Sequence, residues 1–594
     1  MRYLLAPAFF LSLFAQDIPR PEYPQPQFER EQWQSLNGPW EFDFDDANQG
    51  LKEDWSSGAR KFSRSILVPF CFESKKSGIG DPSFHPWVWY RRTFTVPAAW
   101  KTQRVLLHFG AVDYFSAVWI NGKAAGSHTG GNTPFRLDIT PYLKAGANTI
   151  VLRAEDPPTD RSIPRGKQYW EPKSRSIFYT RTTGIWQPVW IEAAGDTYLE
   201  SVQVHAGLDG TVRFDGRVAN AAPELQLSVT IRRNNTDVSS GAGAVNGKYA
   251  AASAVVLNPA LWSVDRPNLY DVVFEIRKGA AVVDRVKSYF GFRKVAVENG
   301  RIYLNNRPIY LKAVLDQGYW PESTLTPPNE DAIQYDIRMT KEMGFNAARK
   351  HQKLEDPRFL YWADKMGLLV SSEMANAYLF DEQYVSRFTQ EWSEAVERDI
   401  NHPSIIIWVP INESWGVPNM RDPKQQAHQK AMYLLTKSLD PTRLVIDNDG
   451  WEHTELTDLF AVHDYTATEE GLMKRWSQWK PGMALPPNGM QYLAHGYSYN
   501  GTPLYLSEFG GIAFIPQGSQ VPAESWGYSG VEKTVESAMT RLQGQYRAIL
   551  ASPFAGICYT QITDVEQEVN GLMTYDRKPK FPVDQLRKLN DTLR

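Results

Sequence analysis

Cysteine is scarce in this chain, and neither sign of charge is in excess. Its 594 residues include only two cysteines, Cys71 and Cys558, and each lies in an apolar run. Two thiols so far apart argue against a disulfide framework and a cysteine-based zinc site, so we expect buried free thiols. The 64 basic and 67 acidic residues give a net charge of −3. That balance argues against a nucleic-acid scaffold and against a polybasic membrane-binding surface.

The N-terminus lacks an apolar stretch long enough to span a membrane. Its apolar segment runs from Tyr3 to Phe14, which falls short of the roughly 20 residues that a spanning helix needs. Arg2 precedes this segment and the small residue Ala15 ends it, an arrangement typical of an export signal over residues 1–15. We therefore predict a periplasmic or secreted protein without membrane contact once the signal is removed. A buried N-terminal segment is the alternative.

Two all-β regions follow. Residues 16–196 carry short apolar runs with Gly, Pro and Asn between them, and Asn121-Gly122 between two such runs predicts a hairpin. This region is predicted to be a jelly-roll β-sandwich. Residues 197–292 continue with alternating apolar residues, as in Glu224–Ile231, and predict an immunoglobulin-like sandwich of about seven strands.

The pattern changes after Arg293, where short apolar runs alternate with helical stretches. Helical patterns at 329–343, 357–366 and 531–551 fall between strand-like runs, and Gly344 and Gly367 resemble helix C-caps. Repeated βα units over residues 293–594 predict a (β/α)8 TIM barrel. We expect its eight strands at 310–314, 346–348, 368–371, 405–411, 444–447, 459–462, 504–506 and 556–559.

Two of these strands lead into glutamates. The run from Ile405 to Gly416 reads IIIWVPINESWG and carries Glu413, and the run from Pro503 to Gly511 reads PLYLSEFGG and carries Glu508. A buried unpaired carboxylate is costly, but the C-terminal rim of a barrel is where active sites are built. A pair of carboxylates is the equipment of glycosidic bond cleavage. We assign Glu413 as acid/base, with a pKa raised by its surroundings and by Glu508, and Glu508 as the ionised nucleophile.

The motifs and their order resemble glycoside hydrolase family 2, whose members include β-galactosidases, β-glucuronidases and β-mannosidases. The resemblance spans nearly the whole chain after the signal. It rests on 36–40 (LNGPW), 184–190 (GIWQPVW), 261–270 (LWSVDRPNLY), 290–293 (FGFR), 344–349 (GFNAAR), Asn412-Glu413 and 507–510 (SEFG). Each motif alone is weak, whereas their common order and spacing are specific.

The resemblance implies further roles. Asn412 is similar to the asparagine that binds the sugar 2-hydroxyl, Tyr465 to the tyrosine that hydrogen-bonds the nucleophile, and Arg349 to an arginine near it. Other sequence positions depart from the family pattern, and there we expect Asp316, Trp320, His351 and His463 to line the sugar pocket. Tyr559 stands where the family has a platform tryptophan. The alternatives are structural: packing for Tyr465 and Trp320, an ion pair for Arg349, a turn for Asn412 and Asp316, and hydrogen-bonded rim positions for the two histidines.

The sequence therefore predicts an exo-acting retaining β-glycosidase. A neutral glycone of the β-galactosidase type is favoured, because the segment 565–571 (VEQEVNG) lacks the Asn-Lys motif that grips a uronate and is acidic instead. Other glycones (β-mannoside, β-glucuronide, galactofuranoside, arabinoside) remain alternatives. So do a non-catalytic carbohydrate-binding protein and, on the residues alone, a metal-dependent hydrolase, which only ten histidines without an H-x-H motif on the first barrel strand support poorly.

The expected partner is an oligosaccharide or glycoside, and no nucleic acid. No cofactor is required by this chemistry, and assistance by Mg²⁺ or Na⁺ is left open. The sequence leaves the oligomeric state open, a homo-oligomer included.

Overall fold

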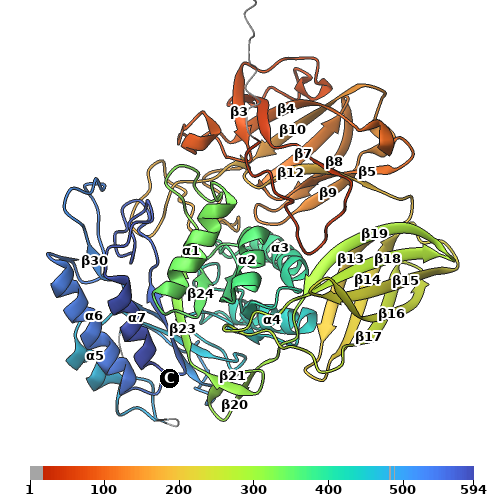
Figure 1. Ribbon diagram of the computed structural model, residues 1–594. Coiled ribbons are helices and arrows are strands. Elements are labelled where there is room, and N and C mark those ends of the chain that lie inside the picture. The colour runs from red at the N-terminus through yellow and green to blue at the C-terminus, as the bar shows by residue number, and fades with distance from the viewer. Residues whose placement is uncertain (1–17, 481–482, 487–488) are drawn as a thin grey trace, which may run out of the picture.

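The computed structural model describes residues 18–480, 483–486 and 489–594, so the predicted export signal lies outside the described residues. In Figure 1 the chain forms two all-β bodies, red to orange and yellow to green, and a body of strands and helices, green to blue. In the described part of the chain, no helix is both long and apolar enough to cross a membrane.

The first body consists of two packed antiparallel sheets, as predicted for a jelly roll. One sheet has the order β1 (Trp33–Ser35), β12 (Val189–Ala194), β5 (Arg104–Phe109), β9 (Phe135–Asp138). The other has the order β3 (Arg64–Val68), β2 (Gly38–Phe44), β4 (Trp87–Thr95), β10 (Ala147–Glu155), β7 (Phe115–Ile120), β8 (Lys123–Thr129). Two further short strands, β6 (Val112–Asp113) and β11 (Gly184–Ile185), pair with each other.

The predicted hairpin joins β7 to β8. Ile120 pairs with Lys123 across a two-residue turn, and both turn residues have positive φ, +52° for Asn121 and +77° for Gly122. That is the type I′ geometry for which Asn-Gly is suited, because glycine and asparagine tolerate the left-handed region. The prediction is confirmed.

The second body holds seven antiparallel strands around one apolar core. Burial alternates along β15 and β18, as expected of a sandwich in which one face of each strand is inside. The strands are β13 (Tyr198–Ala206), β14 (Thr211–Ala219), β15 (Leu225–Arg233), β16 (Thr236–Asn246), β17 (Tyr249–Val255), β18 (Tyr270–Lys278) and β19 (Ala281–Phe290).

A small antiparallel sheet then leads into the barrel. It consists of β20 (Val295–Glu298), β21 (Arg301–Leu304) and β22 (Arg307–Ile309). Its buried side chains, Val295, Ile302 and Leu304, share a cluster with the apolar residues inside the barrel. This small sheet therefore packs against the N-terminal end of the barrel, opposite the rim where active sites form.

The barrel sheet has eight parallel strands in the order 5-4-3-2-1-8-7-6, which confirms the eight predicted strands. They are β23 (Leu311–Asp316), β24 (Ala347–Lys350), β25 (Leu369–Glu373), β26 (Ile405–Val409), β27 (Leu444–Val445), β28 (Phe460–Asp464), β29 (Leu504–Gly510) and β32 (Gly556–Thr560). Within the described residues, β27 and β28 are the ends of the ladder and do not pair with each other.

Helices connect most of the barrel strands. Gly367, with φ +73°, ends α2, and Gly344, with φ +87°, follows α1, as predicted. Residues 531–532 form a short strand, so α6 starts later than predicted. Between β27 and β28 the described chain has a helix-free loop. The helices are α1 (Glu330–Glu342), α2 (Pro357–Met366), α3 (Glu382–Asp399), α4 (Pro423–Leu439), α5 (Glu469–Trp476), α6 (Val535–Leu550) and α7 (Val583–Thr592); β30 (Ala513–Phe514) and β31 (Val531–Glu532) pair after β29.

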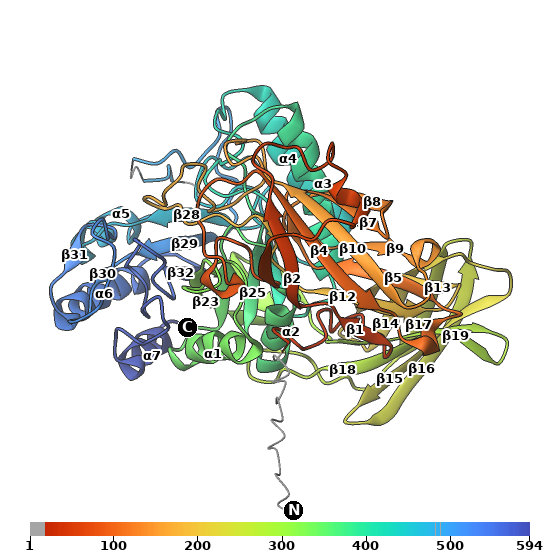
Figure 2. The same ribbon diagram turned by 90° about the horizontal axis from the view of Figure 1, so that it is seen from above.

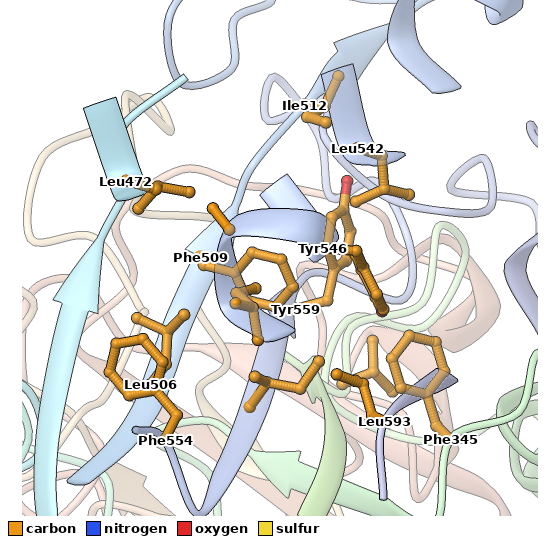
Figure 3. Packing of buried hydrophobic residues seen from close by; sticks show 14 of the residues in the cluster. Phe345, Leu472, Leu506, Phe509, Ile512, Leu542, Tyr546, Phe554, Tyr559 and Leu593 are labelled. Atoms are coloured by element: carbon orange, nitrogen blue, oxygen red, sulfur yellow. The ribbon is translucent and has the colours of Figure 1, made fainter. Parts of the chain in front are cut away.

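Strand alternation divides the barrel side chains between two cores. Leu315, Ala347 and Cys558 point into the barrel, whereas their neighbours pack outward against the helices. Figure 3 shows the outer core, where Phe509 of β29 and Tyr559 of β32 lie beside Tyr546 of α6. The two cysteines are buried and free, as predicted.

A long irregular segment of the first body, residues 157–183, reaches the rim of the barrel. The region was expected to be β-rich throughout, but this segment has neither helix nor strand. The Gly166 amide donates to Asn376 O at 2.9 Å, and the Gln567 side chain donates to Ser176 O at 2.7 Å. Figure 2 shows the N-terminal sheets lying over the barrel. The active-site rim is therefore covered in part by another body of the fold.

Candidate active site

Six barrel strands each place a polar group at the C-terminal rim, where the last inward-facing positions fall. Apolar residues fill the barrel below this level, so the polar groups meet one another above a closed floor. They are Arg349 on β24, Glu373 on β25, Asn412 and Glu413 after β26, Asp449 after β27, His463 on β28 and Glu508 on β29.

Arg349 is the centre of this ring. Its Nε donates to Glu373 at 2.9 Å, and Nη1 lies 3.0 Å from Glu508 Oε1 and 3.1 Å from Asp449 Oδ1. Nη2 donates to Asn412 Oδ1 at 2.6 Å. Burial alone lowers the pKa of Arg349, but Asp449, Glu373 and Glu508 raise it well above its usual value. The guanidinium stays charged and fixes four neighbours in position.

His463 joins the two glutamates. Its Nδ1 lies 3.1 Å from Glu413 Oε1 and 3.4 Å from Glu508 Oε2, and its Nε2 lies 2.9 Å from Asp449 Oδ1. One ligand atom from each of Glu413, His463 and Glu508 lies within 4.8 Å of the other two. Carboxyl groups of retaining glycosidases stand ~5–5.5 Å apart. The barrel thus brings two glutamates from separate strands close together, as such a pair requires.

The proton distribution differs from the sequence-based expectation. Burial raises the pKa of Glu413, but the hydrogen bond and charge of His463 outweigh it and bring that pKa down to about 2. The pKa of His463 is lowered by burial and raised more by Glu508, Asp449 and Glu413, to about 10. The expected raised pKa of the acid/base is therefore wrong for the free protein. The proton rests on the imidazolium, within hydrogen-bond distance of Glu413.

The turn that presents Glu413 is held in an unusual backbone conformation. Glu413 and Ser414 have φ of +51° and +56°, a region that non-glycine residues rarely adopt. The Ser414 amide donates to Asn448 Oδ1 at 2.9 Å, and Trp415 Nε1 donates to Glu413 Oε2 at 3.1 Å. The Glu413 side chain keeps 14% of its surface exposed. These contacts aim the carboxylate at the opening of the barrel.

Tyr465 contacts the second glutamate as the resemblance implied. Its hydroxyl donates to Glu508 Oε2 at 2.6 Å and lies 3.1 Å from Thr560 Oγ1. Its ring stacks on Tyr528, with 3.5 Å between the ring centroids. Tyr528 lies in the loop after β29, and nothing in the local sequence marks it as a site residue.

Asn412 and His351 also reach the ring. Asn412 Nδ2 lies 3.4 Å from Glu413 Oε2, and the Asn412 backbone amide donates to Asn376 Oδ1 at 2.7 Å. His351 Nδ1 lies 3.1 Å from Glu373 Oε1, behind the arginine. Burial lowers the pKa of His351. His351 therefore contacts Glu373, a neighbour of Arg349, rather than Glu413 or Glu508.

Three residues expected in the pocket point elsewhere. Asp316 follows the inward-facing Leu315, so its side chain points outward and binds the Lys350 ammonium at 2.6 Å. Tyr559 follows the inward-facing Cys558 and packs in the outer core (Figure 3). Trp320 lies against Arg577, whose Cζ is 3.7 Å from the ring centroid, and lines a separate surface cavity. Asp316 and Tyr559 point outward because side chains alternate along a strand and the preceding residues, Leu315 and Cys558, face into the barrel.

Both glutamates of the acidic segment 565–571 accept hydrogen bonds from the first body. Glu566 accepts a hydrogen bond from the Thr180 amide at 3.0 Å, and Glu568 accepts one from the Tyr179 hydroxyl at 2.5 Å. Burial raises the pKa of Glu568. The segment thus repels an anionic sugar less than its sequence suggested.

Lys167, which the sequence analysis missed, enters the site from the segment 157–183. The residue is 5% exposed, and its Nζ lies 5.8 Å from the centroid of the Phe178 ring. Phe178 and Tyr378 in turn pack on Trp415, the residue that contacts Glu413. Because Lys167 belongs to another body and lies far from the glutamates in sequence, no local motif identifies it.

Among the described residues, the only three-residue cluster with metal-ligand spacing is Glu413, His463 and Glu508. These are the two glutamates and their bridging imidazole, so this cluster coincides with the candidate active site.

Comparisons with known proteins agree with this architecture. Family models match residues 33–156 ("Glycosyl hydrolases family 2, sugar binding domain"), 197–293 ("Glycosyl hydrolases family 2") and 295–594 ("Glycosyl hydrolases family 2, TIM barrel domain"). Among solved structures, a β-glucuronidase from Ruminococcus gnavus superposes with a TM-score of 0.78 over 96% of this chain and 100% of that one, at 21% identity.

Two curated relatives from Formosa agariphila are both named putative β-glucuronidase. One is 27% identical over 447 residues, which are 72% of this chain and 38% of the relative. The other is 26% identical over 405 residues, 66% of this chain and 48% of the relative. The chain thus spans less than half the length of the curated relatives it matches.

The bridging imidazolium predicts a specific pH dependence of stability. The folded-state pKa of His463, about 10, lies above its ordinary value of 6.5. Its contribution to stability is therefore complete below pH 6.5 and is lost as the pH rises through 10. Between pH 7 and 10 the melting temperature of the native protein should fall more steeply than that of His463→Gln.

Thermal melts at several pH values measure this difference. His205→Gln, which changes a histidine on β13 of the second body, is the control and should follow the native curve. Parallel curves for the native protein and His463→Gln would contradict a proton held on His463.

Proposed function

The chain belongs to glycoside hydrolase family 2, and from this premise we propose that it is a retaining exo-β-glycosidase. The observation that carries the proposal is the closeness of Glu413 and Glu508, of which one carboxylate oxygen each lies within 4.8 Å of the other beside His463. That closeness suits a double displacement, in which the two carboxyl groups stand nearer to each other than in an inverting enzyme.

In the first step Glu508 attacks the anomeric carbon, and Glu413 gives a proton to the leaving oxygen. The bond from the anomeric carbon to the leaving oxygen breaks as the glycosyl ester with Glu508 forms. Arg349 binds one carboxylate oxygen of Glu508 at 3.0 Å, and the Tyr465 hydroxyl donates to the other at 2.6 Å. They fix the direction of attack and keep the nucleophile from rotating.

His463 supplies the proton for this step. Its imidazolium lies 3.1 Å from Glu413, so proton transfer to that carboxylate restores the acid form when the leaving group arrives. Glu508 loses its negative charge as the ester forms, which removes one of the charges that hold the proton on His463. In the second step Glu413 takes a proton from a water molecule while the water oxygen attacks the anomeric carbon. The bond from that carbon to Glu508 breaks, and the carboxylate of Glu508 is released.

For the glycone we propose a β-glucuronide. Support comes from the names of the curated relatives and from the occupied carboxylates of the segment 565–571. The β-galactoside favoured by the sequence is the second candidate, because the segment still lacks an Asn-Lys pair.

Glu508→Gln should lower kcat by several orders of magnitude on every aryl glycoside that the native protein cleaves, because an amide cannot form the glycosyl ester. Steady-state assays with nitrophenyl glycosides measure the loss. Glu455→Gln, a change at the surface, is the control and should leave kcat unchanged. Near-native turnover by Glu508→Gln, with an unchanged melting temperature, would remove the nucleophile assignment.

Glu413→Ala should slow alkyl or disaccharide substrates far more than dinitrophenyl glycosides, since only a poor leaving group needs the acid. The measured quantity is the ratio of kcat/KM for the two substrate classes. Added azide should partly restore turnover of the activated substrate by replacing the water that Glu413 activates. Equal losses on both classes would contradict the acid role.

A further inference from the structure

Lys167 is a buried cation for which the described part of the chain supplies no anion. The residue is 5% exposed, and among the described residues its ammonium faces the Phe178 ring at 5.8 Å without a hydrogen bond or an ion pair. Each of the other buried lysines at the rim, Lys350 and Lys353, is paired with Glu355. The ammonium nitrogen itself keeps contact with solvent, so an anionic ligand can reach it without displacing a partner.

The backbone around Lys167 is fixed to the barrel. Gly166 and Arg165 donate to Asn376 O at 2.9 and 3.2 Å, and the Tyr378 hydroxyl donates to Gly166 O at 2.5 Å. Gly166 has φ +58°, and a Cβ on it would lie 2.3 Å from Gln352 O. The Lys167 carbonyl accepts from the Tyr179 amide at 2.8 Å. The lysine is thus positioned by contacts with the loops that follow β24 and β25.

These contacts tie the backbone beside Lys167 to the loop that also positions the acid/base. Asn376, which anchors Gly166, also receives the Asn412 amide next to Glu413. After burial and His463, the charge of Lys167 is among the causes that set the pKa of Glu413, and it also acts on His351 and Glu568. Its field reaches the acid/base, although it pairs with none of these groups.

The neighbouring carboxylates are already engaged. Glu413 is bound by His463 and Trp415, and Glu568 by the Tyr179 hydroxyl and Asn570 Nδ2. An anion that enters the site therefore finds Lys167 available and does not have to displace an internal partner. A neutral sugar would leave the ammonium unpaired in a site closed by substrate, which is less favourable.

We propose that Lys167 binds a carboxylate of the substrate, as a uronic acid carries, and that this site selects anionic over neutral glycosides. The proposal rests on the glycosidase function above and assigns the recognition of charge to the first body of the fold. The segment 565–571 of the barrel, which lacks a lysine, then has no part in binding that charge.

Three substrates test the proposal: p-nitrophenyl β-D-glucuronide, p-nitrophenyl β-D-galactoside and p-carboxyphenyl β-D-galactoside. Lys167→Met should lower kcat/KM for the glucuronide roughly 100-fold more than kcat/KM for nitrophenyl galactoside, because any effect of the lost charge on Glu413 is common to both substrates. Lys167→Arg, which keeps the charge, should lose less. Lys173→Met changes an exposed lysine of the same segment and should behave as the native protein.

A loss confined to carboxyphenyl galactoside would still support carboxylate binding and would place that group on the leaving-group side. Equal losses on all three substrates, or no loss on any, would overturn the proposal. Turnover of the neutral galactoside without any turnover of the two carboxylates would overturn it too, while leaving the glycosidase function intact. Failure on every substrate by the native protein would instead count against the proposed function.

Calorimetry gives a readout that is independent of turnover. The native protein should bind D-glucuronate at least tenfold more tightly than D-glucose, and Lys167→Met should lose that preference while keeping the native melting temperature. Equal binding of the two sugars by the native protein would contradict the proposal.

Discussion

The buried Arg349 guanidinium is the interaction on which the active site depends. It is held between Glu373, Asp449 and Glu508 and also binds Asn412, so one cation sets the positions of groups from four other strands. Three carboxylates around one arginine leave an excess of negative charge, and the His463 imidazolium offsets part of it. Removing the arginine would leave uncompensated buried carboxylates, which is the costly way to break such a network. Glu508 is thus held by Arg349, and Glu413 is held beside it by the His463 imidazolium.

A second constraint is that the site is completed by a segment outside the barrel. Residues 157–183 leave the β-sandwich, bind the loops after β25, β29 and β32, and pack Phe178 on Trp415, the residue that contacts the acid/base. The barrel supplies the groups that make and break bonds, while the sandwich supplies part of the wall. Such a division lets substrate preference change through the segment without disturbing the catalytic ring.

Much of this arrangement is predictable from the sequence, and the failures have physical causes. The eight barrel strands and the two glutamates carry local signals: apolar runs, glycine caps and carboxylates at strand ends. Asp316 and Tyr559 were misassigned because a short apolar strand does not reveal which of its alternating positions faces inward. Lys167 lies in a segment with no regular structure, and its neighbours are set by tertiary contacts alone. The proton on His463 depends on three carboxylates that converge only in the folded chain.

The stereochemistry of hydrolysis tests the central claim most directly. Proton NMR of the first sugar released from a β-glycoside, recorded before mutarotation, distinguishes the two anomers. A glutamate pair with one oxygen of each within 4.8 Å of the other predicts that the β-anomer appears first. Initial release of the α-anomer would contradict the account, because inversion needs a water molecule between the carboxylates.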